Sequence, residues 1–137
     1  MGASFSHQCD NCGYTVNTSG PWEFYRDKNG VKKPYGHPVP TSKEAEDNGI
    51  KGLYGTFYCS KCDKTFESII VEYKKSTKHS LDVWGGMAEP LDEYKNLILK
   101  CPDCGNIDLL TDASNEKLIN CPKCKKGKFI GMMEWIA

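Results

Sequence analysis

Apolar and aromatic residues gather in short runs that are separated by polar turns. Residues 52–58 form a run that leads into a pair of cysteines, and residues 65–73 form another that leads away from it. Shorter runs at 97–99 and 117–119 precede two further cysteine pairs, and residues 129–136 form a terminal run. Such runs, rich in β-branched and aromatic residues, are typical of strands. The pattern therefore predicts a small, β-rich fold.

One short helix is expected among these strands. Thr41 and Glu44 have the spacing of a capping box, in which the two residues cap the first turn of a helix. Asn48 and Gly49 then offer a C-terminal stop. The spacing predicts a helix of about two turns over residues 42–48, so the fold class becomes α+β.

All eight cysteines of the chain occur in Cys-x-x-Cys pairs. These pairs are Cys9 with Cys12, Cys59 with Cys62, Cys101 with Cys104, and Cys121 with Cys124. Two residues between thiolates allow a tight turn to aim both sulfurs at one ion, while N–H groups of the turn offset part of their charge. Two such turns complete a tetrahedron. The sequence therefore predicts two four-cysteine metal sites, and we expect each to hold Zn²⁺.

The last two pairs have the more specific spacing. Sixteen residues, 105–120, separate them, and this lies within the spacing of zinc ribbons. Pro102 and Pro122 restrict φ early in the two turns, and Gly105 can adopt the positive φ that directs N–H groups at sulfur. This segment resembles the zinc-ribbon and rubredoxin-like class of cysteine knuckles, a scaffold that serves many functions.

The first two pairs are farther apart, with residues 13–58 between them. We interpret them as one ribbon with a large insertion, so each metal site is expected to combine pairs that are neighbours in the sequence. Interleaved pairing remains an alternative, because ligand pairing is not determined by spacing alone.

This interpretation divides the chain into two zinc-ribbon-like modules. The N-terminal module comprises residues 1–80, with an aromatic and proline-rich insertion at 20–50 that contains the short helix. A polar, glycine-containing linker is expected at 81–90. The C-terminal zinc ribbon comprises residues 91–137.

Other uses of paired cysteines fit the sequence less well. A disulfide framework belongs to oxidising compartments, and no apolar signal stretch begins the chain, so we expect a cytoplasmic, reducing location. A thioredoxin-like motif requires one reactive pair that opens a helix in a βαβ unit. Iron in a rubredoxin-like site remains the alternative to zinc, because tetrahedral thiolate sites suit both metals.

The charge balance argues against a generally basic, nucleic-acid-binding surface. Eighteen basic and eighteen acidic residues give a formal net charge of zero. Eight thiolates with two divalent ions would add about −4. A local basic run nevertheless surrounds the last cysteine pair, and it consists of Lys117, Lys123, Lys125, Lys126 and Lys128. These lysines either compensate the negative metal site or contact phosphates, with Phe129 or Trp135 available for base stacking.

The insertion carries the candidate residues for binding a partner, which are Trp22, Phe24, Tyr25, Arg26, Tyr35 and His37. We expect Trp22, Phe24 and Tyr35 to pack into the core, because small β modules build their cores from aromatic side chains. If exposed, they would form a hot-spot surface of the kind that protein partners contact.

No motif of a known catalytic type is present. The chain contains no His-Glu-x-x-His, no glycine-rich phosphate loop and no nucleophile elbow. A site of four cysteines leaves the metal without an open position for substrate. We therefore predict no catalytic residues and no catalytic activity of the chain on its own.

The function that these features favour is a zinc-stabilised interaction module. Such a protein would act as an adaptor, regulator or accessory subunit that binds another protein, and no run is long enough to span a membrane. Three alternatives remain open. They are a nucleic-acid-binding or transcription-associated zinc ribbon, a rubredoxin-like electron carrier, and a subunit of a larger enzyme.

Overall fold

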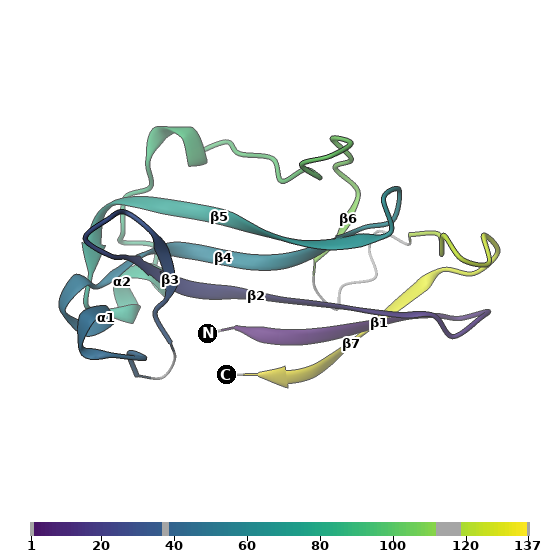
Figure 1. The fold of residues 1–137 in the computed structure, drawn as a ribbon, viewed down its shortest axis with the longest axis horizontal. Coiled ribbons are helices and arrows are strands. Elements are labelled where there is room, and N and C mark those ends of the chain that lie inside the picture. The colour runs from purple at the N-terminus through teal and green to yellow at the C-terminus, as the bar shows by residue number, and fades with distance from the viewer. Residues whose placement is uncertain (1, 37–38, 112–118, 137) are drawn as a thin grey trace.

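A single antiparallel sheet forms most of the molecule. The computed structural model describes residues 2–36, 39–111 and 119–136. Within these residues seven strands form one sheet, with the main order β5-β4-β2-β1-β7, while β3 pairs with β2 and β6 pairs with β4 (Figure 1). The strands are β1 (Ala3–Cys9), β2 (Thr15–Arg26), β3 (Lys32–Pro34), β4 (Ile50–Cys59), β5 (Lys64–Thr77), β6 (Leu109–Leu110) and β7 (Phe129–Ile136). The protein is therefore small and β-rich.

The helices are few and short within the described residues. They are α1 (Lys43–Asn48), α2 (Ser80–Trp84) and the 3-10 helix η1 (Asp92–Tyr94). The cap of α1 differs from the expected one, because Ser42 Oγ accepts the N–H of Ala45 at 3.1 Å. Thr41 instead donates its hydroxyl hydrogen to the carbonyl of Pro34 at 3.0 Å. The capping box expected from Thr41 is thus replaced by a cap one residue later.

Several elements differ from the sequence-based prediction. The expected strands at 52–58 and 65–73 lie inside the longer β4 and β5. Residues 97–99 form no strand. Strand β1 was not predicted, although its burial alternates strictly as expected for a strand with one buried face.

The two long hairpins place two cysteine pairs at the same end of the sheet. Cys9 ends β1 and Cys59 ends β4, so each Cys-x-x-Cys turn forms the tip of a hairpin, β1–β2 or β4–β5. Both tips lie at the right in Figure 1, whereas α1 and α2 lie at the opposite end. The molecule thus has a cysteine end and a helical end.

Strands from the C-terminal third complete the sheet that the N-terminal hairpins begin. Strand β7 pairs with β1 from Phe129 opposite Cys9 to Ile136 opposite Ala3, and β6 pairs with the end of β4. The two expected modules, 1–80 and 91–137, therefore share one sheet. The sheet does not divide at residues 81–90, because backbone hydrogen bonds join strands from both sides of this segment.

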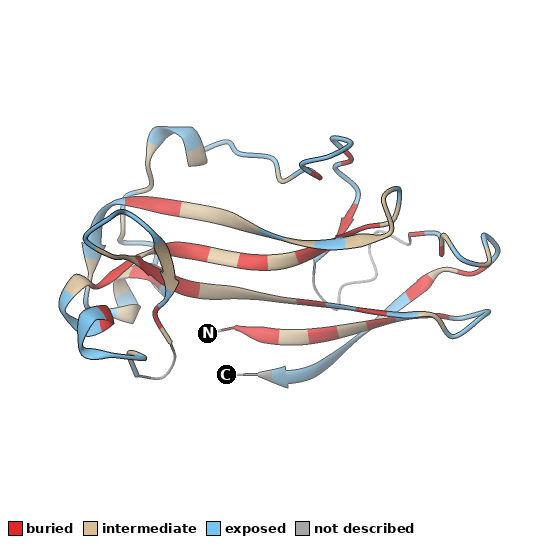
Figure 2. Ribbon diagram, viewed as in Figure 1, coloured by how far each residue is buried: buried red, intermediate tan, exposed pale blue. Residues whose placement is uncertain are grey.

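The core lies along the interior strand β4 and at both ends of the sheet. Strand β4 is buried along most of its length (Figure 2). At the cysteine end, Tyr58 and Phe129 pack edge to face with ring centroids 5.6 Å apart. At the helical end, Tyr25, Tyr35 and Ile50 belong to a second buried cluster.

Candidate metal centres

The fold brings the eight cysteines into two groups of four. One group, here called the outer site, contains Cys9, Cys12, Cys121 and Cys124. The other, the inner site, contains Cys59, Cys62, Cys101 and Cys104. In each group all sulfur atoms lie within 4.8 Å of one another. The first pair thus joins the last, and the second joins the third.

The expectation that the first pair shares a metal with the second, and the third pair with the fourth, is therefore wrong. Pairing of β7 with β1 carries the fourth knuckle to the tip of the first hairpin. Pairing of β6 with β4 holds the third knuckle beside the second hairpin. Strand order, rather than the spacing of 105–120, decides which cysteines meet.

The distances between sulfur atoms fit four thiolates around one metal ion. In the outer site, Sγ of Cys9 lies 3.6 Å from Sγ of Cys124, and Sγ of Cys12 lies 3.7 Å from Sγ of Cys121. In the inner site the corresponding distances are 3.6 Å and 3.8 Å, and the two pairs are Cys59 with Cys104 and Cys62 with Cys101. A tetrahedron with metal–sulfur bonds of about 2.3 Å has edges of about 3.8 Å. All eight cysteines are free, and these separations far exceed a disulfide bond of about 2.05 Å.

A positive φ follows the second cysteine in every knuckle. The φ angles are 78° at Gly13, 50° at Asp63, 75° at Gly105 and 60° at Lys125. Glycine adopts this conformation without a steric cost, so Gly13 and Gly105 are detectable from sequence. Asp63 and Lys125 adopt it as non-glycine residues, which the sequence did not indicate.

Backbone N–H groups of the turns point at the sulfurs. Cys9 Sγ accepts hydrogen bonds from the N–H groups of Asn11 and Cys12, each at 3.4 Å. Cys124 Sγ accepts one from Gly127 at 3.4 Å. The side chain of Asn11 and the amides that follow Cys124 lower the pKa of this thiol to about 5. The outer site therefore favours a thiolate at Cys124.

A buried asparagine has a similar role in the inner site. Asn106 donates a hydrogen bond from Nδ2 to Cys59 Sγ at 3.5 Å, while its Oδ1 accepts the N–H of Asp108 at 3.1 Å. Burial raises the pKa of Cys59, but Asn106 and neighbouring N–H groups outweigh it and lower the pKa overall. By contrast, the pKa of Cys62 rises to about 12 because of its hydrogen bond with Cys104. Without a cation the four thiols do not all ionise together, whereas a divalent metal would compensate four thiolates.

Gly127 allows the two knuckles of the outer site to approach closely. A Cβ atom at this position would overlap Cys9 Sγ and would lie 2.7 Å from both Asn11 Cβ and Asp10 Oδ1. The knuckles are also joined by backbone, because Asp10 donates its N–H to the carbonyl of Lys128 at 3.0 Å. The role of Gly127 depends on a contact with a residue far away in the chain, so sequence reasoning did not find it.

Asp63 links the two metal sites. Its carboxylate follows Cys62 in the inner site and accepts the hydroxyl hydrogens of Tyr58 at 2.6 Å and Tyr14 at 2.8 Å. Lys123, inside the fourth knuckle, lies 3.1 Å from the same carboxylate. The hydrogen bond from Tyr58 is the main cause that lowers the pKa of Asp63. Residues of both sites thus meet at one charged, hydrogen-bonded group.

The lysines of the basic run have different environments. Lys123 pairs with Asp63, and Lys128 Nζ donates to Asn120 Oδ1 at 2.6 Å. Lys125 and Lys126 are exposed. Lys117 lies outside the described residues. Of the two residues expected for stacking, Phe129 is buried, while Trp135 is 57% exposed.

Most of the aromatic residues proposed for partner binding belong to the core. Phe24, Tyr25 and Tyr35 are buried, so their side chains are not available to a partner. The burial of Phe24 and Tyr35 agrees with the expected aromatic core, and the alternative role in partner binding does not fit these three side chains. Three further candidates complete this set. Trp22 is half-buried, Arg26 forms a bidentate ion pair with Glu72 at 2.7 and 2.8 Å, and His37 lies outside the described residues.

The arrangement of cysteines fits the zinc-ribbon-like class of knuckles. In the part of the chain that the structure describes, no helix has the length and apolar character needed to cross a membrane. Comparison with protein-family models, curated proteins and solved structures gave no match, so the functional argument rests on the residues themselves.

Proposed function

We propose that the protein is a zinc-stabilised interaction module that binds another protein. The observation that carries this proposal is the geometry of the two four-cysteine sites, each of which joins segments far apart in the sequence. Zn²⁺ suits a tetrahedron of thiolates and performs no redox chemistry. Four cysteine ligands would leave no open position for a substrate, so the metal would hold the fold together rather than catalyse a reaction.

Zinc would contribute most of its stabilisation at the cysteine end. Binding of structural zinc in small modules contributes on the order of 10 kcal/mol to folding. Each ion would hold the tip of a hairpin to a cysteine knuckle of the C-terminal third. The helical end would then remain available for contacts with a partner.

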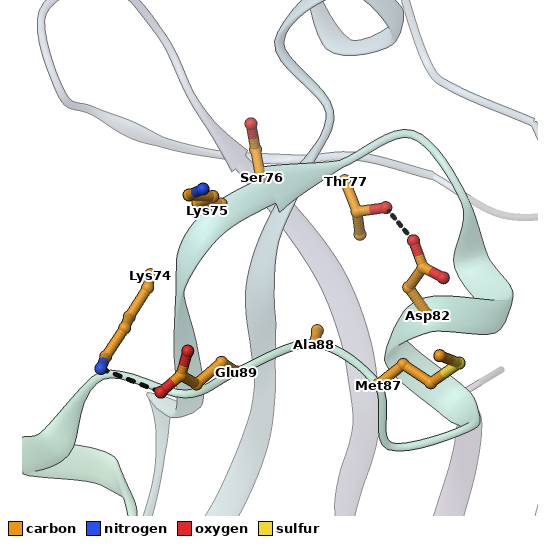
Figure 3. Close-up of a pocket in the computed structure, with 8 residues that line it drawn as sticks. All are labelled: Lys74, Lys75, Ser76, Thr77, Asp82, Met87, Ala88 and Glu89. Atoms are coloured by element: carbon orange, nitrogen blue, oxygen red, sulfur yellow. Dashed lines mark hydrogen bonds and ion pairs between the residues drawn. The ribbon is translucent and has the colours of Figure 1, made fainter.

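Exposed apolar side chains at the helical end supply a surface for that partner. Leu81 and Met87 are 82% and 80% exposed, and Trp84 is also exposed. Met87 lies at the edge of a hollow of about 450 Å³ whose other walls come from residues 74–77 and from Asp82, Ala88 and Glu89 (Figure 3). Methionine and tryptophan are enriched at protein interfaces.

The charges around this hollow favour an acidic partner segment. Lys75 and Lys78 are exposed on the strand end and the following turn. Lys74 pairs with Glu89 at 3.0 Å, and Thr77 donates its hydroxyl hydrogen to Asp82 at 2.7 Å (Figure 3). We expect the partner to place an apolar side chain near Met87 and acidic groups near the exposed lysines.

A pull-down from native cell extract tests this proposal, with the zinc-loaded protein as bait and with or without nuclease. The bait should contain two equivalents of zinc and retain a protein partner in constant ratio after nuclease treatment. Met87→Glu should abolish retention, whereas Ile98→Glu, at another exposed apolar residue, should not. Retention by the Met87 variant, or loss of all binding after nuclease, would contradict the proposed surface.

One observation favours a second candidate function, a rubredoxin-like electron carrier. Cys12 in the outer site and Cys104 in the inner site are exposed, and electron transfer requires accessible sulfur. Protein purified from cells grown with both zinc and iron should be colourless if zinc is the native metal. A red protein with thiolate-to-iron absorption bands would favour the electron carrier instead.

A further inference from the structure

One face of the sheet carries small polar side chains in register across neighbouring strands. Ser4 of β1 lies opposite Ser19 of β2, and Ser19 lies opposite Thr56 of β4. Trp135 of β7 lies opposite Ser4, and Glu67 of β5 lies opposite Thr56. Directly opposite residues of antiparallel strands project from the same face. The result is a transverse row of hydroxyl groups, with an indole at one end and a carboxylate at the other.

A hollow of about 310 Å³ lies on this row. Its lining residues are Ser4, Phe5, Asn17, Thr18, Ser19, Thr56 and Glu134. Three of these residues, Ser4, Ser19 and Thr56, belong to the row, and Asn17 and Glu134 add an amide and a carboxylate. None of the lining residues is a lysine or arginine. Ser6 donates its hydroxyl hydrogen to Glu134 Oε1 at 2.6 Å, which orients the carboxylate at the hollow.

Two tryptophan side chains lie beside this row of hydroxyl groups. Trp22 Nε1 donates a hydrogen bond to Ser19 Oγ at 3.0 Å, and the rings of Trp22 and Trp135 have centroids 6.0 Å apart. The Trp22 ring packs against Gly2, where a Cβ atom would overlap it. Trp135 is more than half exposed. An accessible aromatic surface thus lies next to groups that donate and accept hydrogen bonds.

We propose that this face, here called the polar face, binds a neutral saccharide. Sugar hydroxyls both donate and accept hydrogen bonds, so they match serine and threonine hydroxyls, the amide of Asn17 and the carboxylate of Glu134. The C–H face of a sugar ring packs on an indole, as other apolar groups do. A volume of about 310 Å³ is at the lower end of the range for ligand pockets, which suits one or two sugar units.

Other ligand classes fit the polar face less well. A purely apolar ligand would remove water from several hydroxyls without replacing their hydrogen bonds. An anionic ligand would meet Glu134 and Glu67. Single-stranded nucleic acid uses aromatic stacking as well, but it also requires cations along its phosphates. Lys32 lies 4.1 Å from the centroid of the Tyr54 ring and already pairs with Glu67.

The test is an NMR titration of the full, metal-loaded chain with defined neutral trisaccharides. The probes are maltotriose, cellotriose, chitotriose, mannotriose and xylotriose, with a short thymidine-only DNA strand for comparison. We expect at least one trisaccharide to shift the amide signals of Ser4, Asn17, Ser19 and Thr56 in a saturable way. The DNA strand should leave these signals unchanged.

Matched variants separate binding at the polar face from binding elsewhere. Trp135→Ala and Glu134→Gln should each weaken the affinity about five- to tenfold, because one removes the aromatic surface and the other a charged acceptor. Trp84→Ala removes an exposed tryptophan on α2 and should not change the affinity. Metal content and amide spectra establish that each variant is folded.

Three results would overturn the proposal. The first is that none of the five trisaccharides shifts these signals at millimolar concentration. The second is that sugar binding survives in both Trp135→Ala and Glu134→Gln. The third is that the DNA strand binds this face more tightly than any sugar. None of these results depends on whether a protein partner binds the helical end, so the two proposals are tested separately.

Discussion

Replacing Gly127 with alanine tests the assignment of cysteines to the outer site. The new methyl group would overlap Cys9 Sγ and would come within 2.7 Å of Asn11 and Asp10. Gly127 does not have a positive φ, so the substitution adds steric overlap without backbone strain. Overpacking of this kind costs about 1–3 kcal/mol. If the overlap destabilises the metal-bound form by this amount and leaves the metal-free form unchanged, the affinity of the outer site for metal should fall by about 5- to 150-fold.

The assay is stepwise removal of metal by a chromophoric chelator, followed by amide NMR. In the wild-type protein the release of the two metal ions gives one metal affinity for each site. In Gly127→Ala one equivalent should be released at lower chelator concentration, and the first signals to change should be those of Cys9, Cys12, Cys121 and Cys124.

Gly105→Ala is a matched control at the inner site. Its φ is 75° and no atom lies within 4 Å of the added Cβ, so only backbone strain acts, at a cost of about 1 kcal/mol. In Gly105→Ala the metal ion that is released first should be the one bound by Cys59, Cys62, Cys101 and Cys104. The reasoning would be refuted if Gly127→Ala weakened the inner site or if either variant weakened both sites equally.

Three further substitutions test other contacts. Cys101→Ser should remove one equivalent of metal and disturb the β4–β5 hairpin tip while sparing the β1–β2 tip, as mass spectrometry and amide NMR would show. Asp63→Asn keeps a residue that tolerates a positive φ but removes the charge between the sites, so urea unfolding of the metal-loaded protein should show a loss of about 1–3 kcal/mol. An unchanged urea midpoint of unfolding would show that the Asp63 carboxylate does not stabilise the contact between the two sites. Glu72→Gln should cost a similar amount at neutral pH, because Arg26 lowers the pKa of Glu72 below 4.5. This contribution is present above pH 4.5 and disappears as the pH falls through the lowered pKa, so the variant and wild-type stabilities should converge in acid.

Local patterns predicted a substantial part of the structure. The apolar runs at 52–58 and 65–73 lie in β4 and β5, because alternation and turn residues act between neighbours in the chain. The burial of Phe24 and Tyr35 agrees with the expectation of an aromatic core. The cap of α1 moved from Thr41 to Ser42, since the tertiary contact of Thr41 with Pro34 competes with capping.

The candidate site was less predictable. Asn106 and Gly127 act on sulfur atoms of Cys59 and Cys9, which are remote in the sequence. Helix α2 lies in a polar stretch that carries no capping signal, and His79 at its N-cap forms no side-chain capping bond. Such features arise from packing and have no signature in a local window.

The amino-acid sequence by itself determined the eight candidate metal ligands and the turn form of the two knuckles that contain a glycine. A Cys-x-x-Cys turn is local, and its geometry depends on residues such as Gly13 and Gly105 within the same few positions. Only the tertiary structure decided which knuckles share a metal and which aromatic side chains remain exposed. Both depend on strand order, since the pairing of β7 with β1 brings Cys9 to Cys124 and Trp135 to Trp22. Backbone hydrogen bonds between strands have no sequence specificity of their own, so long-range packing determines this order.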